Sequence, residues 1–406
     1  MKIGYLIPEW PGQSHVWAWR EISYLRELWL DITIFSTRQP KELGKHSFAL
    51  AAQAETCYLW PLSISKIILS LTWAIVRHLK GFLSCIQLAF TLPVDKQPSW
   101  KSVLPLIIPA CRLAQEVEYR QIEHLHTPIP GNSAILCMMV KRLVDLPFSL
   151  TVVAPFSHWG GAIQEKFEDA VFVTLVAQWM VDQMQRDFGS ISPDHYCITR
   201  HGVDIKKWMP NPSKRLSDSP SKQIFTIGRL AFSKGFDVLL KSLAIVKSRG
   251  ISFQLKIAGE GTERSLLETL IHDLDLASNV VLLGSVSEEQ CLAEMQSSDL
   301  FVSPSRVEGF SVARQEAMVV EVATIGTDIE GADELIVNGV NGLLVPSEQP
   351  ESLADAISQL LTDDVLRKQL AKAGRQTIIE KFDSRLGAAT LHNLILRTNP
   401  KKGDRL

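Results

Sequence analysis

Short runs of aliphatic and β-branched residues alternate along the chain with segments of helical period. In the first half, this pattern predicts strands at 2–7, 31–36, 122–126, 148–153, 171–176 and 196–199, with amphipathic helices at 16–29 and 132–143. A second series of strands is predicted at 223–228, 254–259, 280–284, 299–305, 323–327 and 342–346, with helices near 235–249, 262–274, 287–296, 311–320 and 331–336. Alternating strands and helices with short connections are typical of parallel sheets covered by helices on both faces.

Two such series indicate two domains, which the length of 406 residues also favours. We expect an N-terminal Rossmann-like domain over 1–205 and a C-terminal Rossmann-like domain over 223–385. Residues 206–222 are rich in Pro, Ser and Lys and lack periodicity, so they are predicted to be a linker. Residues 386–406 are expected to form a C-terminal helix and tail. One interpretation is that this segment packs back on the N-terminal domain. The expected fold class is α/β, with two doubly wound domains facing a cleft and ligands at the carboxyl ends of the strands.

Composition restricts the class of partner. The net charge is −2 and the basic residues are scattered, which argues against nucleic acid. The six cysteines include no C-x-x-C pair, which argues against a zinc site or a disulfide framework and fits a reducing compartment. The N-terminus leads directly into a predicted strand without a signal-peptide pattern, so a cytoplasmic location is expected.

Residues 62–92 form an apolar segment that is interrupted by Lys66, Arg77, His78 and Lys80. No uninterrupted apolar run reaches the roughly 20 residues that a membrane-spanning helix needs. Two interpretations stay open. The segment is either a helical element that contacts the inner membrane surface or a buried helical insertion of the first domain.

Two basic residues follow the first strand of the second series. Arg229 and Lys234 precede a helix that opens near Gly235, and two cations beside a helix N-terminus suit a diphosphate. Solvated surface charges are the alternative. After the third strand of this series, backbone groups near Val286 are candidates for contact with a nucleotide base.

The fourth strand of the second series leads into "RVEGFSVARQE", which contains Glu308 and Glu316. Eight residues of helix would separate them by about 12 Å, so they are not a glycosidase-like acid and base pair. They suit the hydroxyl groups at opposite ends of an elongated sugar nucleotide whose diphosphate lies at the helix N-terminus near Gly309 and Ser311. The alternative is one glutamate favoured by the helix dipole and another on a solvated helix face.

In this order and spacing, "GRLAFSKGFDVLL", "IAGEGTERSLL", "VVLLGSVSEEQ", "SRVEGFSVARQEAM" and "NGLLVP" resemble the retaining glycosyltransferases of the GT-B fold, family four. The resemblance covers nearly all of 223–385. It implies that Glu308 meets the donor sugar, that Glu316 holds the ribose and that Arg229 and Lys234 neutralise the diphosphate. Backbone groups at Gly309 and Phe310 would add contacts to the sugar and phosphate.

The first domain resembles the family more loosely, through "PEWPGQSHVWAWREI". The resemblance implies that it binds the acceptor and that Gly12, Gln13 and Ser14 approach the diphosphate. The nearby tryptophans are candidates either for stacking on an acceptor sugar or for helix packing. They are Trp10, Trp17 and Trp19.

Two positions depart from the family pattern. Val153 stands where relatives commonly carry a histidine near the reacting sugar, and His158 is the nearest histidine that follows it. The usual A-G-x-P turn at the helix end here has Glu321 for glycine and Ala323 for proline, which alters a helix C-cap.

The resemblance implies a retaining hexosyltransferase that moves a sugar from a nucleotide-diphosphate donor to a glycan or lipid-linked acceptor in cell-surface polysaccharide synthesis. No cofactor or metal is expected, since the cations and helix termini supply positive charge, and the D-x-D string at Asp273 and Asp275 falls at the end of a surface helix. Two alternatives remain: a catalytically impaired homologue that binds donor or acts as a scaffold, and a sugar-nucleotide epimerase.

Overall fold

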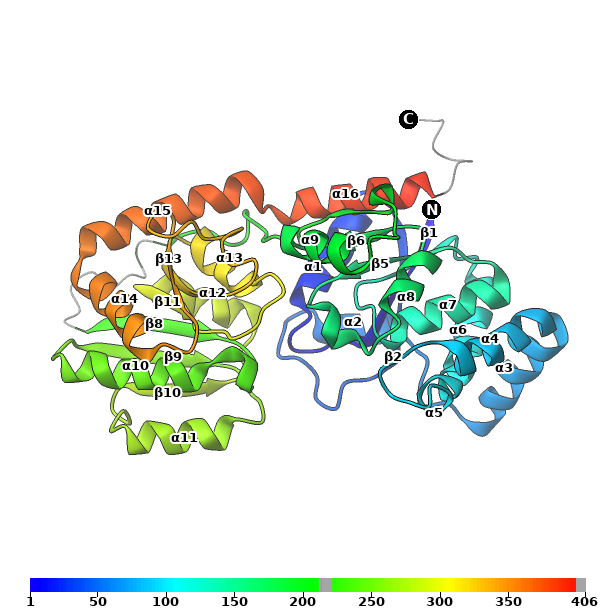
Figure 1. The fold of residues 1–406 in the computed structure, drawn as a ribbon, viewed down its shortest axis with the longest axis horizontal. Helices are drawn as coiled ribbons and strands as arrows, with labels where there is room; N and C mark the ends of the chain where they lie inside the picture. The colour runs from blue at the N-terminus through cyan, green and yellow to red at the C-terminus, as the bar shows by residue number, and fades with distance from the viewer. Residues whose placement is uncertain (212, 214–220, 399–406) are drawn as a thin grey trace. The chain divides into compact units, whose positions relative to one another are not determined.

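The computed structural model describes residues 1–211, 213 and 221–398. The chain divides into two compact units (Figure 1). Among the described residues, unit 1 contains Met1–Gly44, Phe48–Arg200 and those from Arg385 onwards, and unit 2 contains Lys45–Ser47 and those within His201–Ser384. The predicted linker and C-terminal tail lie partly outside the described residues, and the predicted cleft between the domains stays a prediction.

Unit 1 is built on a parallel sheet in the order β3-β2-β1-β4-β5-β6-β7. Its strands are β1 (Lys2–Glu9), β2 (Asp31–Arg38), β3 (Cys57–Tyr58), β4 (His124–Thr127), β5 (Phe148–Val152), β6 (Val173–Leu175) and β7 (Tyr196–Ile198). All six strands predicted in the first half are present. The sequence pattern missed β3, because a strand of two residues has too little alternation to be recognised.

The helices of unit 1 lie between these strands, with a last helix from the C-terminus. They are α1 (Val16–Glu27), α2 (Ala49–Glu55), α3 (Ile64–Arg77), α4 (Leu79–Thr91), α5 (Trp100–Val103), α6 (Ile107–Arg120), α7 (Asn132–Val144), α8 (Ile163–Asp169), α9 (Gln178–Asp187) and α16 (Ser384–Arg397), with 3-10 turns η1 (Leu104–Leu106), η2 (Phe156–Trp159) and η3 (Pro193–His195). Leu391 and Ile395 of α16 are fully buried in the same core cluster as Ile3 of β1. The C-terminal helix therefore packs on the first domain.

Segment 62–92 folds into α3 and α4. Among the described residues, no single helix has the length and apolar character needed to cross a membrane. The α3 and α4 pair meets that test only when taken together, and the two helices are bent by 111° relative to each other.

Unit 2 contains a second parallel sheet in the order β10-β9-β8-β11-β12-β13. Its strands are β8 (Lys222–Ile227), β9 (Phe253–Ala258), β10 (Val280–Gly284), β11 (Leu300–Ser303), β12 (Ala323–Asp328) and β13 (Leu343–Pro346). Neighbouring residues of a strand enter different cores: Ile224 packs in one hydrophobic cluster and Phe225 in another. Burial on both faces explains why these strands are continuous apolar runs.

Helices cover both faces of this second sheet. They are η5 (Phe232–Lys234), α10 (Phe236–Ser248), α11 (Arg264–Asp273), α12 (Glu288–Ser297), α13 (Val312–Val319), α14 (Pro350–Thr362) and α15 (Asp364–Lys381). The helix predicted near 331–336 is wrong, because the chain there forms only turns. Two parallel-sheet domains of this kind confirm the predicted fold class.

The strand order places a switch point in each sheet. In unit 2 the chain runs outward from β8 through β9 to β10 and then returns to the other side of β8 as β11. The loops after β8 and β11 therefore leave neighbouring strands in opposite directions, which is where doubly wound sheets bind ligands. These loops contain Lys234 and Glu308. In unit 1 the corresponding switch point lies between β1 and β4.

Candidate functional site

The loop after β8 is held close to the loop after β11 by Gly235. This residue has a φ of 65°, and a Cβ placed on it would lie 2.1 Å from the carbonyl oxygen of Pro304. Any larger residue would push the two loops apart. Gly235 also precedes the first residue of α10, so Lys234 lies at the N-terminus of that helix.

Lys234 and Glu308 meet at the switch point. The Lys234 ammonium donates to Oε1 of Glu308 at 2.5 Å, and the Ser305 hydroxyl donates to the same oxygen at 3.0 Å. Burial acts to raise the pKa of the Glu308 carboxyl, but the Lys234 ammonium, the nearby Arg314 and the Ser305 hydrogen bond outweigh it and hold that pKa below its usual value. Glu308 is therefore a carboxylate at neutral pH. The structure thus brings together a cation predicted to bind diphosphate and a carboxylate predicted to bind sugar.

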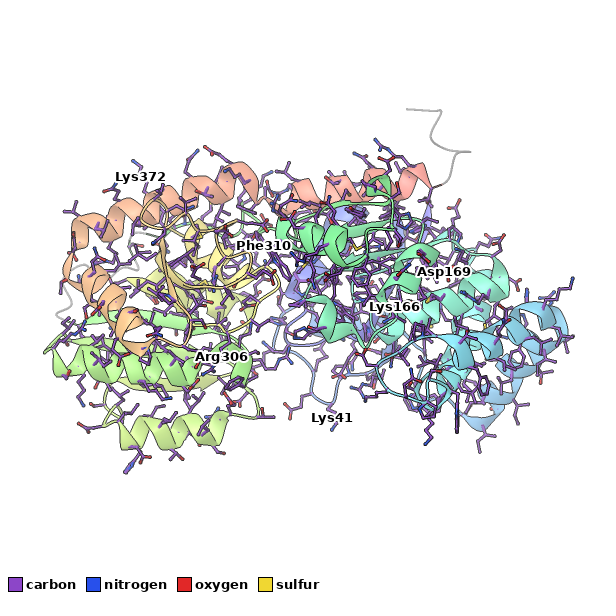
Figure 2. The ribbon with its side chains drawn as sticks, viewed as in Figure 1. Lys41, Lys166, Asp169, Arg306, Phe310 and Lys372 are labelled. Carbon is purple, nitrogen blue, oxygen red and sulfur yellow. The ribbon has the colours of Figure 1, made fainter. Side chains whose placement is uncertain are left out.

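A second arginine, which the sequence analysis did not identify, joins the two loops. The backbone N–H of Arg306 donates to the Ser233 carbonyl at 2.8 Å. Its guanidinium donates to both oxygens of Asp237, at 2.8 and 3.0 Å, and also to Glu348. The guanidinium carbon lies 3.9 Å from the centre of the Phe232 ring. Figure 2 labels Arg306 in unit 2. Arg306 therefore fixes the position of the loop that carries Lys234.

A buried arginine lies beneath the same site. Arg314 of α13 is 2% exposed, and its Nη2 donates to the Ser303 carbonyl and the Thr327 hydroxyl, both at 3.4 Å. Burial lowers the pKa of Arg314, and the charge of Glu308 opposes that effect. The two form an electrostatic pair inside the domain. No sequence pattern indicated that Arg314 pairs with Glu308, because a single arginine within a predicted helix is usually a surface charge.

A small cavity of about 10 Å³ adjoins the pair. It is lined by Glu308, Gly309, Phe310, Ser311, Arg314, Ile329, Glu330, Gly331, Ala332 and Leu335. The structure thus gathers four predicted residues at one place and adds the loop after β12, around Glu330 and Gly331, that the sequence analysis did not select. An acidic residue beside a glycine in a loop after a strand was the signal available there.

The N-terminus of α13 is capped by Ser311, the residue that precedes the helix. The Ser311 hydroxyl accepts a hydrogen bond from the backbone N–H of Arg314 at 3.4 Å. The Phe310 ring packs against Phe382 with 5.4 Å between ring centres. Glu316 lies further along α13 and is 9% exposed, so it is not on a solvated helix face. That result removes the solvated-face alternative for Glu316.

Two other predicted donor residues of unit 2 lie at the same edge of its sheet. Arg229 follows β8 and has an exposed side chain. Val286 follows β10, and its side chain is buried in the core beside α12. Only the backbone of Val286 is therefore suited to contact a ligand, as the sequence analysis expected.

In unit 1, the predicted glycine loop follows β1 at its switch point. A Cβ on Gly12 would lie 2.9 Å from Nδ1 of His15, and Gln13 is half-buried in the same loop. Trp10 is fully buried and stacks with Trp19 and Phe48, at 6.3 and 6.0 Å between ring centres. Trp10 is thus a packing residue and does not stack on an acceptor.

The position at which relatives commonly carry a histidine comes directly after β5. Val153 there is half-buried, and His158 is exposed on η2. The segment that follows His158 is held by Lys166, whose ammonium donates to the carbonyls of Trp159 and Gly161, each at 2.7 Å. Burial lowers the pKa of Lys166 to about 8.

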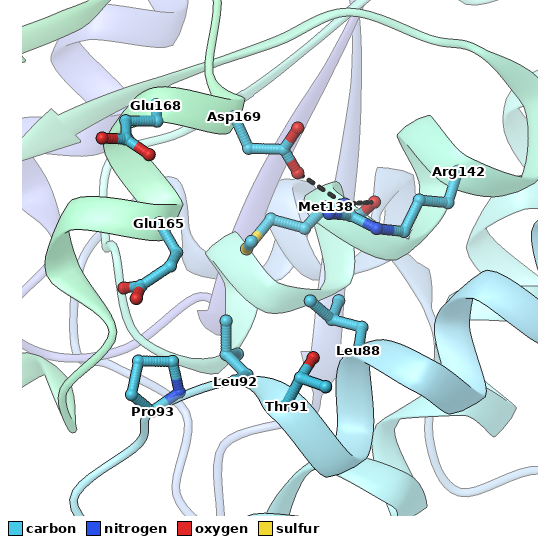
Figure 3. A pocket seen from close by; sticks show the side chains of 9 residues that line it. All are labelled: Leu88, Thr91, Leu92, Pro93, Met138, Arg142, Glu165, Glu168 and Asp169. Carbon is cyan, nitrogen blue, oxygen red and sulfur yellow. Dashed lines mark hydrogen bonds and ion pairs between the residues drawn. The ribbon is translucent and has the colours of Figure 1, made fainter.

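A larger cavity, of about 340 Å³, lies elsewhere in unit 1 (Figure 3). It is lined by Leu88, Thr91, Leu92, Pro93, Met138, Arg142, Glu165, Glu168 and Asp169. Arg142 and Asp169 are paired at 2.5 Å. None of the predicted site residues lines it, so its size alone does not make it the reaction site. In the described ranges, no group of three or more His, Cys, Asp or Glu side chains is arranged to hold a metal ion.

Comparison with known proteins identifies the family. Residues 210–377 match the family described as Glycosyl transferases group 1. Alpha-D-kanosaminyltransferase of Streptomyces kanamyceticus is 32% identical over 286 residues, which is 64% of this chain and 72% of that protein. The capsular polysaccharide biosynthesis glycosyltransferase CapM of Staphylococcus aureus is 32% identical over 161 residues, 39% of this chain and 42% of that protein.

The solved structure of Anabaena Alr3699/HepE in complex with UDP-glucose has a TM-score of 0.72 at 16% identity and covers 98% of this chain and 99% of that one. At this identity the likeness establishes the fold alone. The family match and the kanosaminyltransferase relative concern sequence, and the matched residues 210–377 include the loops that hold Lys234 and Glu308. This chain belongs to the glycosyl transferases of group 1.

Proposed function

We propose that this glycosyltransferase moves a hexose-type sugar from a nucleotide-diphosphate donor to a glycan or glycolipid acceptor with retention of anomeric configuration. The contact between Lys234 and Glu308 at the switch point carries the proposal. In this contact a cation proposed to bind the diphosphate lies beside a carboxylate proposed to bind sugar hydroxyls, and Glu316, proposed to bind the ribose, lies further along α13.

The chemistry follows from these charges. The bond between the anomeric carbon and the diphosphate oxygen breaks, and its electron pair leaves with the diphosphate. The acceptor hydroxyl oxygen bonds to the same face of the sugar, and its proton passes to an oxygen of the departing diphosphate. Lys234, Arg229 and the N-terminus of α13 stabilise the charge that develops on the leaving group. No metal or cofactor is part of this proposal.

A role in cell-surface polysaccharide synthesis, on the cytoplasmic side, is part of the proposal. The name of the Staphylococcus aureus relative, a capsular polysaccharide biosynthesis glycosyltransferase, supports it. The name of Alr3699/HepE in complex with UDP-glucose supports a sugar nucleotide as the donor.

The test is a screen of nucleotide sugars by thermal shift, followed by transfer assays with the donors that stabilise the chain. Proton NMR of the first product gives its anomeric configuration. A product with the donor's configuration supports the proposal, and an inverted product contradicts retention.

A second candidate is a catalytically impaired homologue that binds the donor. The observation that favours it is Val153, because an aliphatic side chain cannot exchange a proton and His158 is exposed on a neighbouring turn. This candidate requires donor binding without hydrolysis or transfer over many acceptors. Turnover by the unmodified chain would rule it out.

A further inference from the structure

The helices α3 and α4 pack on unit 1 mainly through small residues. Their buried residues are Ser70 and Ala74 of α3 and Cys85, Leu88 and Ala89 of α4. Ser70 of α3 is fully buried and donates to Gln115 of α6 at 3.1 Å. Gly81 of α4 lies so close to α7 that an added Cβ would be 2.2 Å from the Arg142 carbonyl oxygen. These contacts fix which side of each helix faces the protein.

The side that faces away is apolar. We define the outer face as the exposed large apolar residues of the two helices, which are between 43% and 77% exposed. They are Ile64, Ile68, Leu69, Ile75, Val76, Leu79, Leu83 and Phe90. On each helix these residues are spaced mainly by four or seven positions, so they lie on one side of it. Figure 1 shows α3 and α4 at the edge of their unit.

This distribution is the reverse of the usual one. A surface helix of a globular protein normally turns its apolar stripe inward and its polar residues outward. Here the exposed stripe is Ile, Leu, Val and Phe, and a contiguous apolar surface of this kind marks an interaction site.

The charged residues that α3 and α4 themselves contribute have one sign. The sequence contains no Asp or Glu between Glu55 and Asp95. Lys66, Arg77 and Lys80 are exposed on the two helices, and Arg77 also lies 3.5 Å from Glu118 of α6. The two helices therefore present an apolar outer face with basic residues of their own.

We propose that the outer face docks on the surface of an anionic lipid bilayer. An apolar stripe enters the boundary between headgroups and acyl chains, while basic side chains reach the anionic headgroups. Exposed Trp60 and Trp100, just before α3 and at the start of α5, are suited to the same interface. A second copy of the chain fits less well, because a symmetric contact would bring two faces with basic residues of the same sign together.

Binding is measured by co-sedimentation of the full chain with phosphatidylglycerol-containing vesicles and with pure phosphatidylcholine vesicles. The unmodified chain pellets with the anionic vesicles and much less with the neutral ones. The double variant Ile68→Glu with Val76→Glu reduces the affinity for anionic vesicles by at least about tenfold, because two charged groups replace side chains that would be buried in lipid. Both positions are exposed, so the variant retains its fold, and circular dichroism checks this.

Val365→Glu is the matched control, since Val365 of α15 is as exposed as Val76 but lies in unit 2. The affinity of this variant for anionic vesicles is unchanged.

A second comparison tests the basic residues. The double variant Lys66→Glu with Lys80→Glu binds anionic vesicles more weakly, whereas Lys372→Glu on α15 does not. Equal pelleting of the outer-face variants and the unmodified chain overturns the proposal. Equal binding to neutral and anionic vesicles also overturns it, and so does a dimer in light scattering that the Ile68 and Val76 variant abolishes. The measurement uses no sugar donor, so its outcome is independent of the proposed reaction.

Discussion

Removing the charge of Glu308 tests the pairing at the switch point. In the structure, the Lys234 ammonium is bound to Glu308 at 2.5 Å. A diphosphate that uses Lys234 must compete with this carboxylate. In Glu308→Gln the side chain keeps its shape but loses its charge. We therefore expect nucleoside diphosphates without a sugar to bind more tightly to this variant, while sugar transfer is lost.

The size of the effect follows from the exposure of the pair. A hydrogen bond between charged groups contributes about 1.5–3 kcal/mol net. The side chains of Lys234 and Glu308 are 23% and 18% exposed, so solvent screening lowers this to about 1–2 kcal/mol. That difference corresponds to about 5–30-fold in the dissociation constant.

Isothermal titration calorimetry with UDP and with GDP measures the change. Glu294→Gln is the matched control, because Glu294 forms a comparable pair with Lys256, at 2.7 Å, away from the switch point. Its affinity for nucleoside diphosphates is unchanged. Lys234→Ala weakens binding. The reasoning is refuted if Glu308→Gln binds the diphosphates no better than the unmodified chain while Lys234→Ala leaves their binding unaltered.

Four further outcomes are expected. Glu316→Ala weakens nucleotide binding by about tenfold in calorimetry, which is the loss of about one charge-assisted hydrogen bond to a ribose; unchanged affinity contradicts the assignment. Arg306→Ala leaves Asp237 without its bidentate partner and lowers the free energy of unfolding by about 3 kcal/mol, measured by urea denaturation. The pKa of Lys166 is lowered to about 8, so between about pH 8 and 10.5 the unfolded chain binds the additional proton and stability rises with pH; thermal melts of Lys166→Met lack this rise. Glu321→Gly raises the melting temperature by about 1–3 °C, because Glu321 has a φ of 58° that glycine adopts without strain.

The arrangement around Glu321 shows what the sequence was able to predict. Relatives were expected to have glycine at this helix end, and Glu321 indeed adopts the left-handed conformation that favours glycine. The Glu321 N–H donates to the Met318 carbonyl and the Val322 N–H to the Ala317 carbonyl, which is the Schellman arrangement. The sequence analysis expected Glu321 to alter this helix C-cap, and that expectation is wrong, because the cap keeps its Schellman hydrogen bonds. A local backbone requirement of this kind is readable from sequence because it depends on a few consecutive residues.

The strands were predictable for a similar reason. Strands buried on both faces are continuous apolar runs, so β8 and β11 stand out from their surroundings. Their order in the sheet was not predictable, because it depends on pairing between segments far apart in sequence. The pairing of Leu300 with Ile224 is what creates the switch point between Lys234 and Glu308.

The contacts of Arg306 could not be predicted from the sequence for the same reason. Its partners Asp237 and Glu348 lie 69 and 42 residues away in sequence, and neither spacing repeats a known motif.

The sequence left open whether Trp10 packs in the core or stacks on a sugar, and its complete burial shows that it packs. Burial of a single aromatic residue depends on its tertiary neighbours, which hydrophobic pattern alone does not identify.

The two glutamates of "RVEGFSVARQE" differ in how they are held. Glu308 lies in the loop before α13, which begins at Val312, and its carboxylate is bound by the side chains of Lys234 and Ser305. Glu316 is buried within the helix. A ligand can draw Lys234 away from Glu308 by a change of side-chain contacts alone, whereas Glu316 keeps its position on α13. Because a preformed group contributes to binding at no cost in reorganisation, loss of Glu316 should appear chiefly in the affinity for the nucleotide. Loss of the Glu308 charge should appear chiefly in the rate of transfer, since its contacts are rearranged as the diphosphate arrives and leaves.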